Sequence, residues 1–294
     1  MKQTPLILAF LLFCILPAVK AQDICFEHID NNNGLSQNTV QAIIQDRDGF
    51  LWFGTKNGLN RFDGVHFKTF KHIPGSEEGL GNSQVRCLEE DSDGNIWIGT
   101  NSGLYIYKTT EGIFESKTVL DTDGNEIPCL ILIIKRGPDG SMWVAIERLG
   151  IYRMRKGETE LKQVFKNTSP IRSLEIDQSS GTIWFSWSGN GLFYTEDGFK
   201  TYLPYCLEDG SRIFPADIIS SILISGFNKI YLGLEGIGAF ELNKATRKIK
   251  RLDLGEKFVF GRNMMQYSPE ELWIGTEAGI YIWDINSETS RHLE

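Results

Sequence analysis

The sequence lacks the features that mark several large classes of protein. Beyond its first residues it has no apolar run long enough to cross a membrane, since the run at 129–134 has only the length of a strand. It has no Cys-x-x-Cys pair, which excludes the usual zinc and thioredoxin-like sites. It has no Gly-x-Ser-x-Gly nucleophile elbow either. Its 30 Lys and Arg against 38 Asp and Glu give a net charge of −8, which argues against a nucleic-acid partner.

The first 21 residues differ in composition from the rest of the chain. Lys2 precedes an apolar run, and small residues stand at the −3 and −1 positions of a cut before Gln22. The run is too short to span a bilayer comfortably, so this pattern is typical of a cleaved secretory signal. An uncleaved N-terminal anchor is the alternative, and a lipoprotein cut at Cys14 lacks the small residues that such a site needs. We predict a signal peptide at 1–21 and an exported chain without a further membrane span.

The cysteines that follow the predicted cut are Cys25, Cys87, Cys129 and Cys206. Export permits disulfides, and four cysteines allow three pairings. They are scattered and do not hold equivalent positions, so we expect mostly buried thiols with at most one bridge.

One aromatic signature recurs six times along the chain, as in LWFGT, IWIGT and LWIGT. The spacings between its aromatic residues are 45, 46, 41, 47 and 42 residues, and a glycine follows six or seven residues later in every copy. The aromatic positions are Trp52, Trp97, Trp143, Trp184, Tyr231 and Trp273.

Each copy has the pattern of four short strands. Asp-Gly turns suit tight hairpins, β-branched and aromatic residues dominate the strands, and runs with helical periodicity are essentially absent. One such sheet of about 43 residues cannot bury both of its faces, whereas radial repetition buries them against neighbouring sheets. We therefore predict an all-β propeller whose six aromatic residues pack between blades. The glycine two residues later (Gly54, Gly99, Gly233 and Gly275) would leave room for the next blade. A β-sandwich, the alternative, does not predict a fixed repeat.

The segment at 34–64, GLSQNTVQAIIQDRDGFLWFGTKNGLNRFDG, resembles the two-component regulator propeller repeat. The resemblance extends over 23–294 and is strongest in the first, second and sixth units. It implies the periplasmic sensor of a hybrid two-component system of Bacteroidetes, in which two seven-bladed propellers and a β-domain precede a membrane helix, a histidine kinase, a receiver and an AraC-type domain. Such propellers sense glycan-derived sugars and control polysaccharide-utilisation genes. The kinase and receiver motifs have no counterpart in this sequence.

The sensor domain is predicted at 22–294, in six units at 34–73, 74–118, 119–166, 167–206, 207–252 and 253–294. The N-terminal segment CFEHID resembles the fourth strands of the units, which favours a truncated seven-bladed propeller. We expect such an unclosed ring to be poorly soluble or to self-associate when expressed alone. The resemblance implies that the full-length parent is a homodimer through its propellers.

Ligand contacts are predicted on one rim, in the loops after the second strands. Trp187 with Asn190 would suit a sugar, because aromatic faces stack on sugar rings, and Arg148 and Lys56 lie in equivalent loops. Inter-blade packing is the alternative for Trp187 and for Trp283, and loop charges are usually only solvated. The expected ligand is a small molecule or an oligosaccharide.

No metal, cofactor or catalytic residue is predicted. Three of the four histidines lie in separate segments with the pattern of a fourth strand. Radial repetition would keep these histidines apart, whereas a metal site needs two or three ligands at one point. The segments at 91–95 and 121–126 resemble the starts of calcium loops but lack the distal Glu at fixed spacing. Acidic pairs, as in LEED, have the pattern of surface clusters. A glycosidase or lyase would turn glycans over, a sensor would only bind them, and a scaffold would bind a protein instead.

Overall fold

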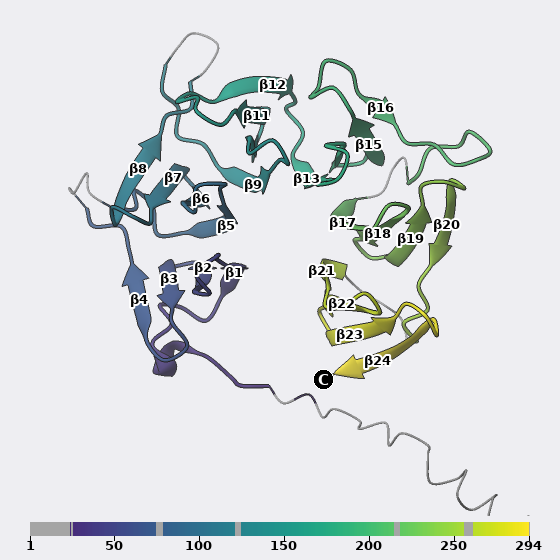
Figure 1. Ribbon diagram of the computed structural model, residues 1–294, viewed down its shortest axis with the longest axis horizontal. Coiled ribbons are helices and arrows are strands. Elements are labelled where there is room, and N and C mark those ends of the chain that lie inside the picture. Colours follow the sequence, from purple (N-terminus) through teal and green to yellow (C-terminus); the bar gives the residue numbers. More distant parts are fainter. Residues whose placement is uncertain are drawn as a thin grey trace, which may run out of the picture.

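The computed structural model describes residues 24, 26–74, 79–120, 125–214, 218–255 and 261–293. These residues form six four-stranded antiparallel sheets, each built from four consecutive strands. The sheets stand radially around one axis, so the fold is a six-bladed β-propeller and the predicted fold class is confirmed (Figure 1). The predicted signal peptide and Cys25 lie outside the described residues.

The first strand of each blade lies nearest the axis and the fourth lies outermost (Figure 1). Blades one to three consist of β1 (Val40–Gln45), β2 (Leu51–Thr55), β3 (Gly58–Phe62), β4 (Phe67–Phe70), β5 (Val85–Glu90), β6 (Ile96–Thr100), β7 (Gly103–Lys108), β8 (Ile113–Lys117), β9 (Ile131–Arg136), β10 (Met142–Ile146), β11 (Gly150–Met154) and β12 (Lys162–Lys166). Blades four to six consist of β13 (Ile171–Ile176), β14 (Ile183–Trp187), β15 (Leu192–Thr195), β16 (Leu203–Pro204), β17 (Ile219–Ser225), β18 (Lys229–Leu234), β19 (Gly238–Asn243), β20 (Lys248–Arg251), β21 (Gly261–Gln266), β22 (Glu271–Thr276), β23 (Gly279–Asp284) and β24 (Thr289–Leu293).

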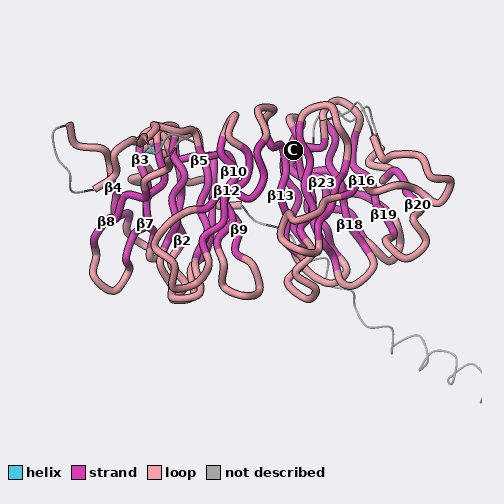
Figure 2. Tube along the Cα trace, turned by 90° about the horizontal axis from the view of Figure 1, so that it is seen from above, coloured by secondary structure: helices cyan, strands magenta, loops and turns pink. Residues whose placement is uncertain are grey.

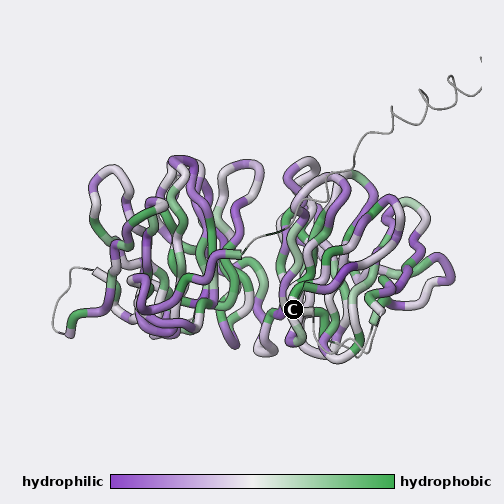
Figure 3. Tube along the Cα trace, turned by 90° about the horizontal axis from the view of Figure 1, so that it is seen from below, coloured by the Kyte–Doolittle hydropathy of each residue, from purple (hydrophilic) through white to green (hydrophobic). Residues whose placement is uncertain are grey.

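The strands run between two faces of the disc, and the loops gather at both faces (Figure 2). Hydrophobic residues concentrate in the strands, whereas the loops are mostly hydrophilic (Figure 3). A single 3-10 turn, η1 (Asn31–Asn33), precedes β1 and is capped by the side chain of Asp30. The turns that join the strands therefore form both faces of the molecule, and the core lies between the blades.

The turn between the first two strands is tied to the aromatic residue that follows it. In blade one, Oδ1 of Asp46 accepts hydrogen bonds from two backbone N–H groups of its own turn, and Oδ2 accepts from Nε1 of Trp52 at 2.7 Å. Asp91 makes the same set of contacts in blade two, with Nε1 of Trp97 at 3.1 Å. One carboxylate thus closes the hairpin and fixes the orientation of the indole.

The turn between the second and third strands depends on the Gly-Thr end of the repeat. Oγ1 of Thr55 donates to the carbonyl oxygen of Gly58 at 2.9 Å, and Thr100 and Thr276 make the same bond in their blades. Gly58 has a φ of 127°, in the left-handed region that side-chain-bearing residues rarely adopt. The recurring glycine is therefore a conformational requirement of the turn.

Five clusters of buried apolar side chains lie between adjacent blades. In the first, Trp52 of β2 is fully buried and its ring lies 5.4 Å from that of Tyr107 in β7. The equivalent aromatic residues of the other buried clusters are Trp97, Trp143, Trp184 and Tyr231. Trp283 is also buried in the cluster between blades five and six. Because both faces of blades two to five and one face each of blades one and six are covered in this way, burial of apolar surface holds neighbouring blades together.

Close packing of the blades also uses the glycine of the repeat. A Cβ atom on Gly54 would lie 2.6 Å from Cγ1 of Val85 in the next blade, and one on Gly99 would lie 2.6 Å from Cγ2 of Ile131. In both cases the neighbour is the first residue of the next innermost strand. A β-branched residue of one blade therefore fits into the space that the glycine of the previous blade leaves open.

The ring is open between blades one and six, where the C-terminal end of β24 lies (Figure 1). Trp273 of β22 differs from the other five repeat aromatics, since it is only half-buried and stacks on Tyr267 with ring centroids 5.2 Å apart. The segment at 26–30, which resembles a fourth strand in sequence, forms no strand here, and Phe26 contacts the edge of Trp273. Gly275, the equivalent of Gly99, has only the carbonyl oxygen of Asn263 near its Cβ position, at 3.7 Å.

Candidate functional site

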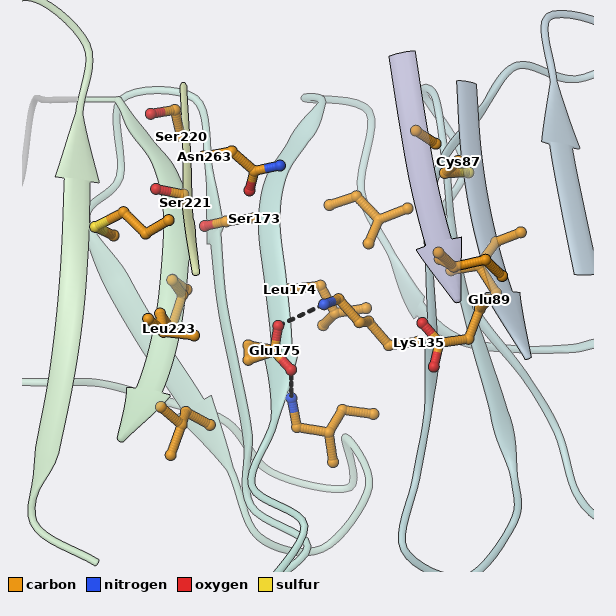
Figure 4. Close-up of a pocket in the computed structure, with 18 of the residues that line it drawn as sticks. Cys87, Glu89, Lys135, Ser173, Leu174, Glu175, Ser220, Ser221, Leu223 and Asn263 are labelled. Atoms are coloured by element: carbon orange, nitrogen blue, oxygen red, sulfur yellow. Dashed lines mark hydrogen bonds and ion pairs between the residues drawn. The ribbon is translucent and has the colours of Figure 1, made fainter. Parts of the chain in front are cut away.

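The six innermost strands surround a central channel with a cavity of about 770 Å³. Residues of β1, β5, β9, β13, β17 and β21 all line it. Its volume lies within the range of about 300–1,000 Å³ that is usual for small-molecule sites. Figure 4 shows its wall, with Lys135, Glu175 and Glu89 near the middle and Ser220, Ser221 and Asn263 toward one end.

Each innermost strand contains a β-bulge at the same register position. In β5, Val85 pairs with Thr100 and Cys87 pairs with Gly99, so Arg86 is the extra residue. The extra residues of the six strands are Gln41, Arg86, Leu132, Arg172, Ser220 and Arg262. The first five line the cavity. A bulge redirects a side chain that regular alternation would place elsewhere, and in blades one to five it adds one channel-lining position per blade.

Two of the five bulge residues that line the cavity are arginines. Arg172 is exposed, and its Nε donates to Oγ of Ser188 at 2.7 Å. Arg86 is half-buried, and its guanidinium approaches Oδ1 of Asn101 at 3.5 Å. Both partners are neutral groups, so they do not compensate the positive charges of the two arginines. The end of the channel that carries these bulge residues is the bulge end.

A charged cluster lies three residues further along the same strands. Nζ of Lys135 in β9 lies 2.5 Å from Oε2 of Glu175 in β13 (Figure 4). Burial alone would lower the pKa of Lys135, but the charge and the hydrogen bond of Glu175 raise it. Burial raises the pKa of Glu89 in β5 to about 7, although Lys135 opposes the shift and Glu175 adds to it. With a pKa of about 7, the carboxyl group of Glu89 changes its charge near neutral pH.

The raised pKa of Glu89 predicts a specific dependence of stability on pH. Well below pH 4.5 the carboxyl group of Glu89 is protonated in both the folded and the unfolded chain, so burying it costs no ionisation free energy. As the pH rises from 4.5 to about 7, the unfolded chain ionises first, so folding stability is lost. Glu89→Gln stays neutral, and we expect it to be more stable than the wild type at pH 8 by about 1–2 kcal/mol and equally stable at pH 4.5.

Urea unfolding of the two proteins at both pH values measures this difference. Glu158→Gln is the control, since Glu158 lies outside the channel and a hydrogen bond from Lys162 lowers its pKa. An equal pH dependence for wild type and Glu89→Gln would show that Glu89 does not titrate in the way described.

A third feature of the wall is a set of small polar groups that follow the bulges. Oγ of Ser173 is hydrogen-bonded to Oγ of Ser186 and to the carbonyl oxygen of Ile219 in the next blade. Cys87 makes the equivalent, weaker contact with the carbonyl oxygen of Ile131. Ser221 holds the same position in β17, but its buried Oγ has no hydrogen-bond partner among the described residues. A buried hydroxyl without a partner is an exception among buried polar groups.

The four residues that the sequence indicates as ligand contacts lie outside this channel. Lys56 and Arg148 are exposed in the turns after β2 and β10. Trp187 ends β14, where its ring stacks on Phe193 at 4.2 Å and contacts Phe165 of the neighbouring blade at 5.6 Å. Asn190 lies in the following turn and bonds to the carbonyl oxygen of Ser188. These contacts engage Trp187 in packing between blades three and four, and none of the four residues lines the cavity.

The residues considered for metal binding have other roles in the described part of the chain. Within those residues, no group of three or more His, Cys, Asp or Glu side chains is placed to hold a metal ion. Asp91 closes its hairpin and bonds to Trp97, as described above, and residues 121–124 of the second candidate loop are outside the described residues. Cys87, Cys129 and Cys206 are free thiols, and burial raises the pKa of Cys87 to about 12 and that of Cys129 to about 11.

Reasoning from the sequence missed the channel residues. Glu89 belongs to the LEED segment, which has the pattern of a solvated cluster, yet it lines the cavity. The second residue of the innermost strands would have been a usable signal for the channel. The strands β1, β5 and β13 begin with VQA, VRC and IRS, and in each a polar residue stands between two residues that pack between blades. Without the hairpin register, however, such a residue cannot be distinguished from an ordinary outward-facing one.

Two segments of the chain, residues 34–57 and 79–102, match the family model described as two component regulator propeller. A curated relative, "Histidine kinase P4" of Formosa agariphila, is 41% identical over 71 residues, which are 23% of this chain and 5% of that protein.

Among solved structures, the extracellular domain of a hybrid two-component system from B. thetaiotaomicron matches with a TM-score of 0.76 and 20% identity. The match covers 91% of this chain and 36% of that one. A second such domain from the same organism gives 0.73 and 19%, covering 92% and 38%. Virginiamycin B lyase from Staphylococcus aureus has a TM-score of 0.67 at 13% identity, covering 87% and 84%. The chain thus spans about a third of the two extracellular domains. No helix among the described residues is long and apolar enough to cross a membrane.

Proposed function

Starting from a chain that carries two-component regulator propeller repeats, we propose that it is the periplasmic ligand-sensing propeller of a hybrid two-component system. The observation that carries this proposal is the repeat match at residues 34–57 and 79–102, on a chain folded as a propeller. The likeness in fold to extracellular domains of such systems supports it. The sensing role therefore rests on the family of the repeats rather than on the fold alone, because propellers serve many functions.

The ligand in this proposal is a small molecule or an oligosaccharide, and the genes controlled are those for carbohydrate use. The channel supports a binding role, since it combines apolar walls with a few charged and polar side chains. In a full-length parent, two propeller regions would pair. A ligand with different affinities for two arrangements of that pair would bias the kinase on the other side of the membrane.

Two other functions use the same fold. A secreted scaffold would bind a protein partner through its rims and would take no sugar. A propeller glycosidase or lyase would cleave the sugar it binds, and the fold of virginiamycin B lyase is similar to this one. The sensor, scaffold and enzyme therefore differ in two measurable properties, which are sugar binding and turnover.

The test is to incubate the protein with a panel of neutral and acidic glycan fragments of plant and host origin. We expect at least one fragment to raise the melting temperature saturably, since a ligand at 100 times its Kd adds about 2.7 kcal/mol to the free energy of unfolding. Chromatography of the same samples should show the fragment unchanged. Cleavage would replace the sensor with an enzyme, and the absence of binding across the panel would favour the scaffold.

A further inference from the structure

Two arginines at the bulge end of the channel have no acidic partner among the described residues. Arg86 of β5 and Arg172 of β13 hold the same register position and line the same cavity. Neither makes an ion pair with a carboxylate of the described residues, and their polar partners are a side-chain amide and a hydroxyl. In a chain with a net charge of −8, two such arginines on one channel wall are conspicuous. The planar fork of a guanidinium matches the oxygens of a carboxylate or a sulfate.

The residue between the two arginines adds an apolar surface. Leu132 of β9 holds the bulge position in blade three, between the blades that carry Arg86 and Arg172, and it lines the cavity. A ligand that spans the two arginines would therefore cross an apolar side chain between its charged contacts. This combination suits a molecule with both charged groups and apolar ring faces.

The far end of the wall sets the orientation of such a ligand. Glu89 and Glu175 lie three residues beyond the arginines on the same two strands, a distance of about 10 Å along a strand. Lys135 compensates Glu175 directly through their ion pair. An anionic group of a ligand would gain little beside Lys135, because that charge is already paired with Glu175. The electrostatics of the channel therefore favour binding of the ligand's negative charge at the bulge end.

Polar side chains line the channel on the blades that follow Arg172. Ser221 of β17 lines the cavity, but its Oγ is buried and has no hydrogen-bond partner among the described residues. Asn263 of β21 is exposed next to it (Figure 4). The amide group of Asn263 can donate to and accept from a hydroxyl group of a ligand.

We infer that the bulge end of the channel is a binding site for an anionic sugar, with a carboxylate or sulfate held by Arg86 and Arg172 and a hydroxyl reaching the exposed Asn263. This site deepens the proposed sensor function, on which it rests, by naming its place and the class of its ligand.

Calorimetric titration of the full chain tests the inference with three probes. These are digalacturonate, its neutral counterpart galactobiose, and a heparin disaccharide that carries sulfate. We expect at least one of the two anionic probes to bind at least about tenfold more tightly than galactobiose, and less tightly as salt rises. Arg86→Gln and Arg172→Gln should each weaken that binding by about tenfold or more, since a hydrogen bond to a charged group contributes that much.

Two further variants control the experiment. Arg251→Gln removes an exposed arginine of β20 that does not line the cavity, and it should leave the affinity unchanged. Arg172→Lys keeps the charge and should retain part of the affinity that Arg172→Gln loses, which separates loss of a contact from loss of fold.

Three results would overturn the inference. They are no binding of either anionic probe, tighter binding of galactobiose than of both, or Arg86→Gln and Arg172→Gln variants that bind no more weakly than Arg251→Gln. The sensor proposal fails separately, when no fragment of the wider glycan panel binds at all.

Discussion

Trp52→Ala is expected to lower the free energy of unfolding by about 3–5 kcal/mol, the range for a large aromatic side chain removed from a core. Trp52 is fully buried between blades one and two, with its ring 6.1 Å from that of Phe70 and 5.4 Å from that of Tyr107. The variant also leaves Asp46 without the indole N–H that bonds to its Oδ2. Urea unfolding followed by far-ultraviolet circular dichroism measures the change.

Trp273→Ala is the matched control for this prediction. Trp273 holds the same repeat position in blade six, but it is half-buried. Its ring contacts the rings of Tyr267 and Phe26 instead of side chains of a following blade. We expect a loss of about 1 kcal/mol, as for an aromatic pair at a partly exposed site. Equal losses for the two variants would contradict the assignment of Trp52 to packing between blades.

Gly99→Val is expected to lower the free energy of unfolding by about 3 kcal/mol, because extra volume in a packed interface forces side chains and backbone to move. The added Cβ would lie 2.6 Å from Cγ2 of Ile131 and would also collide with Sγ of Cys87. The substitution therefore disturbs the packing of β6 against the first residue of β9. Thermal and urea unfolding of the variant measure the loss.

Gly275→Val provides the comparison at the open edge. Among the described residues, the nearest atom to the Cβ position is the carbonyl oxygen of Asn263 at 3.7 Å, which is an ordinary contact. Valine is favoured in strands, so we expect a change within about 0.5 kcal/mol. A large loss at Gly275 would mean that strand geometry, rather than the neighbouring blade, requires glycine at this position.

The architecture could be predicted from the sequence because its main signal is periodic. Spacings of 41–47 residues between Trp52 and Trp273 determine six units, and a four-stranded unit of that length has few ways to bury both faces. The glycines at 54 and 99 were interpreted correctly as space for the next blade, because a missing side chain in a strand implies close approach. The role of Asp46 as acceptor for Trp52 was not predicted, since a carboxylate six residues before a Trp is also an ordinary turn residue.

The channel was harder to predict for a physical reason. Whether Arg86 points to the axis or to a neighbouring blade depends on a one-residue shift in the pairing of β5 with β6, which the order of the residues does not reveal. The pKa of Glu89 depends on Lys135 and Glu175, which are 46 and 86 positions away and meet Glu89 only when blades two to four are assembled. Trp187 and Asn190 were found by residue type alone, and residue type does not distinguish a ring that packs from a ring that binds.

The recurring bulge has a consequence for how such proteins diversify. Because the extra residues of the first five innermost strands line the channel, their identity can change without altering the buried contacts that hold the blades together. These five positions, one in each of blades one to five, therefore form a set that mutation can explore at little risk to folding. Engineering a new recognition specificity would begin with a library at these five codons, with the rest of the gene kept constant.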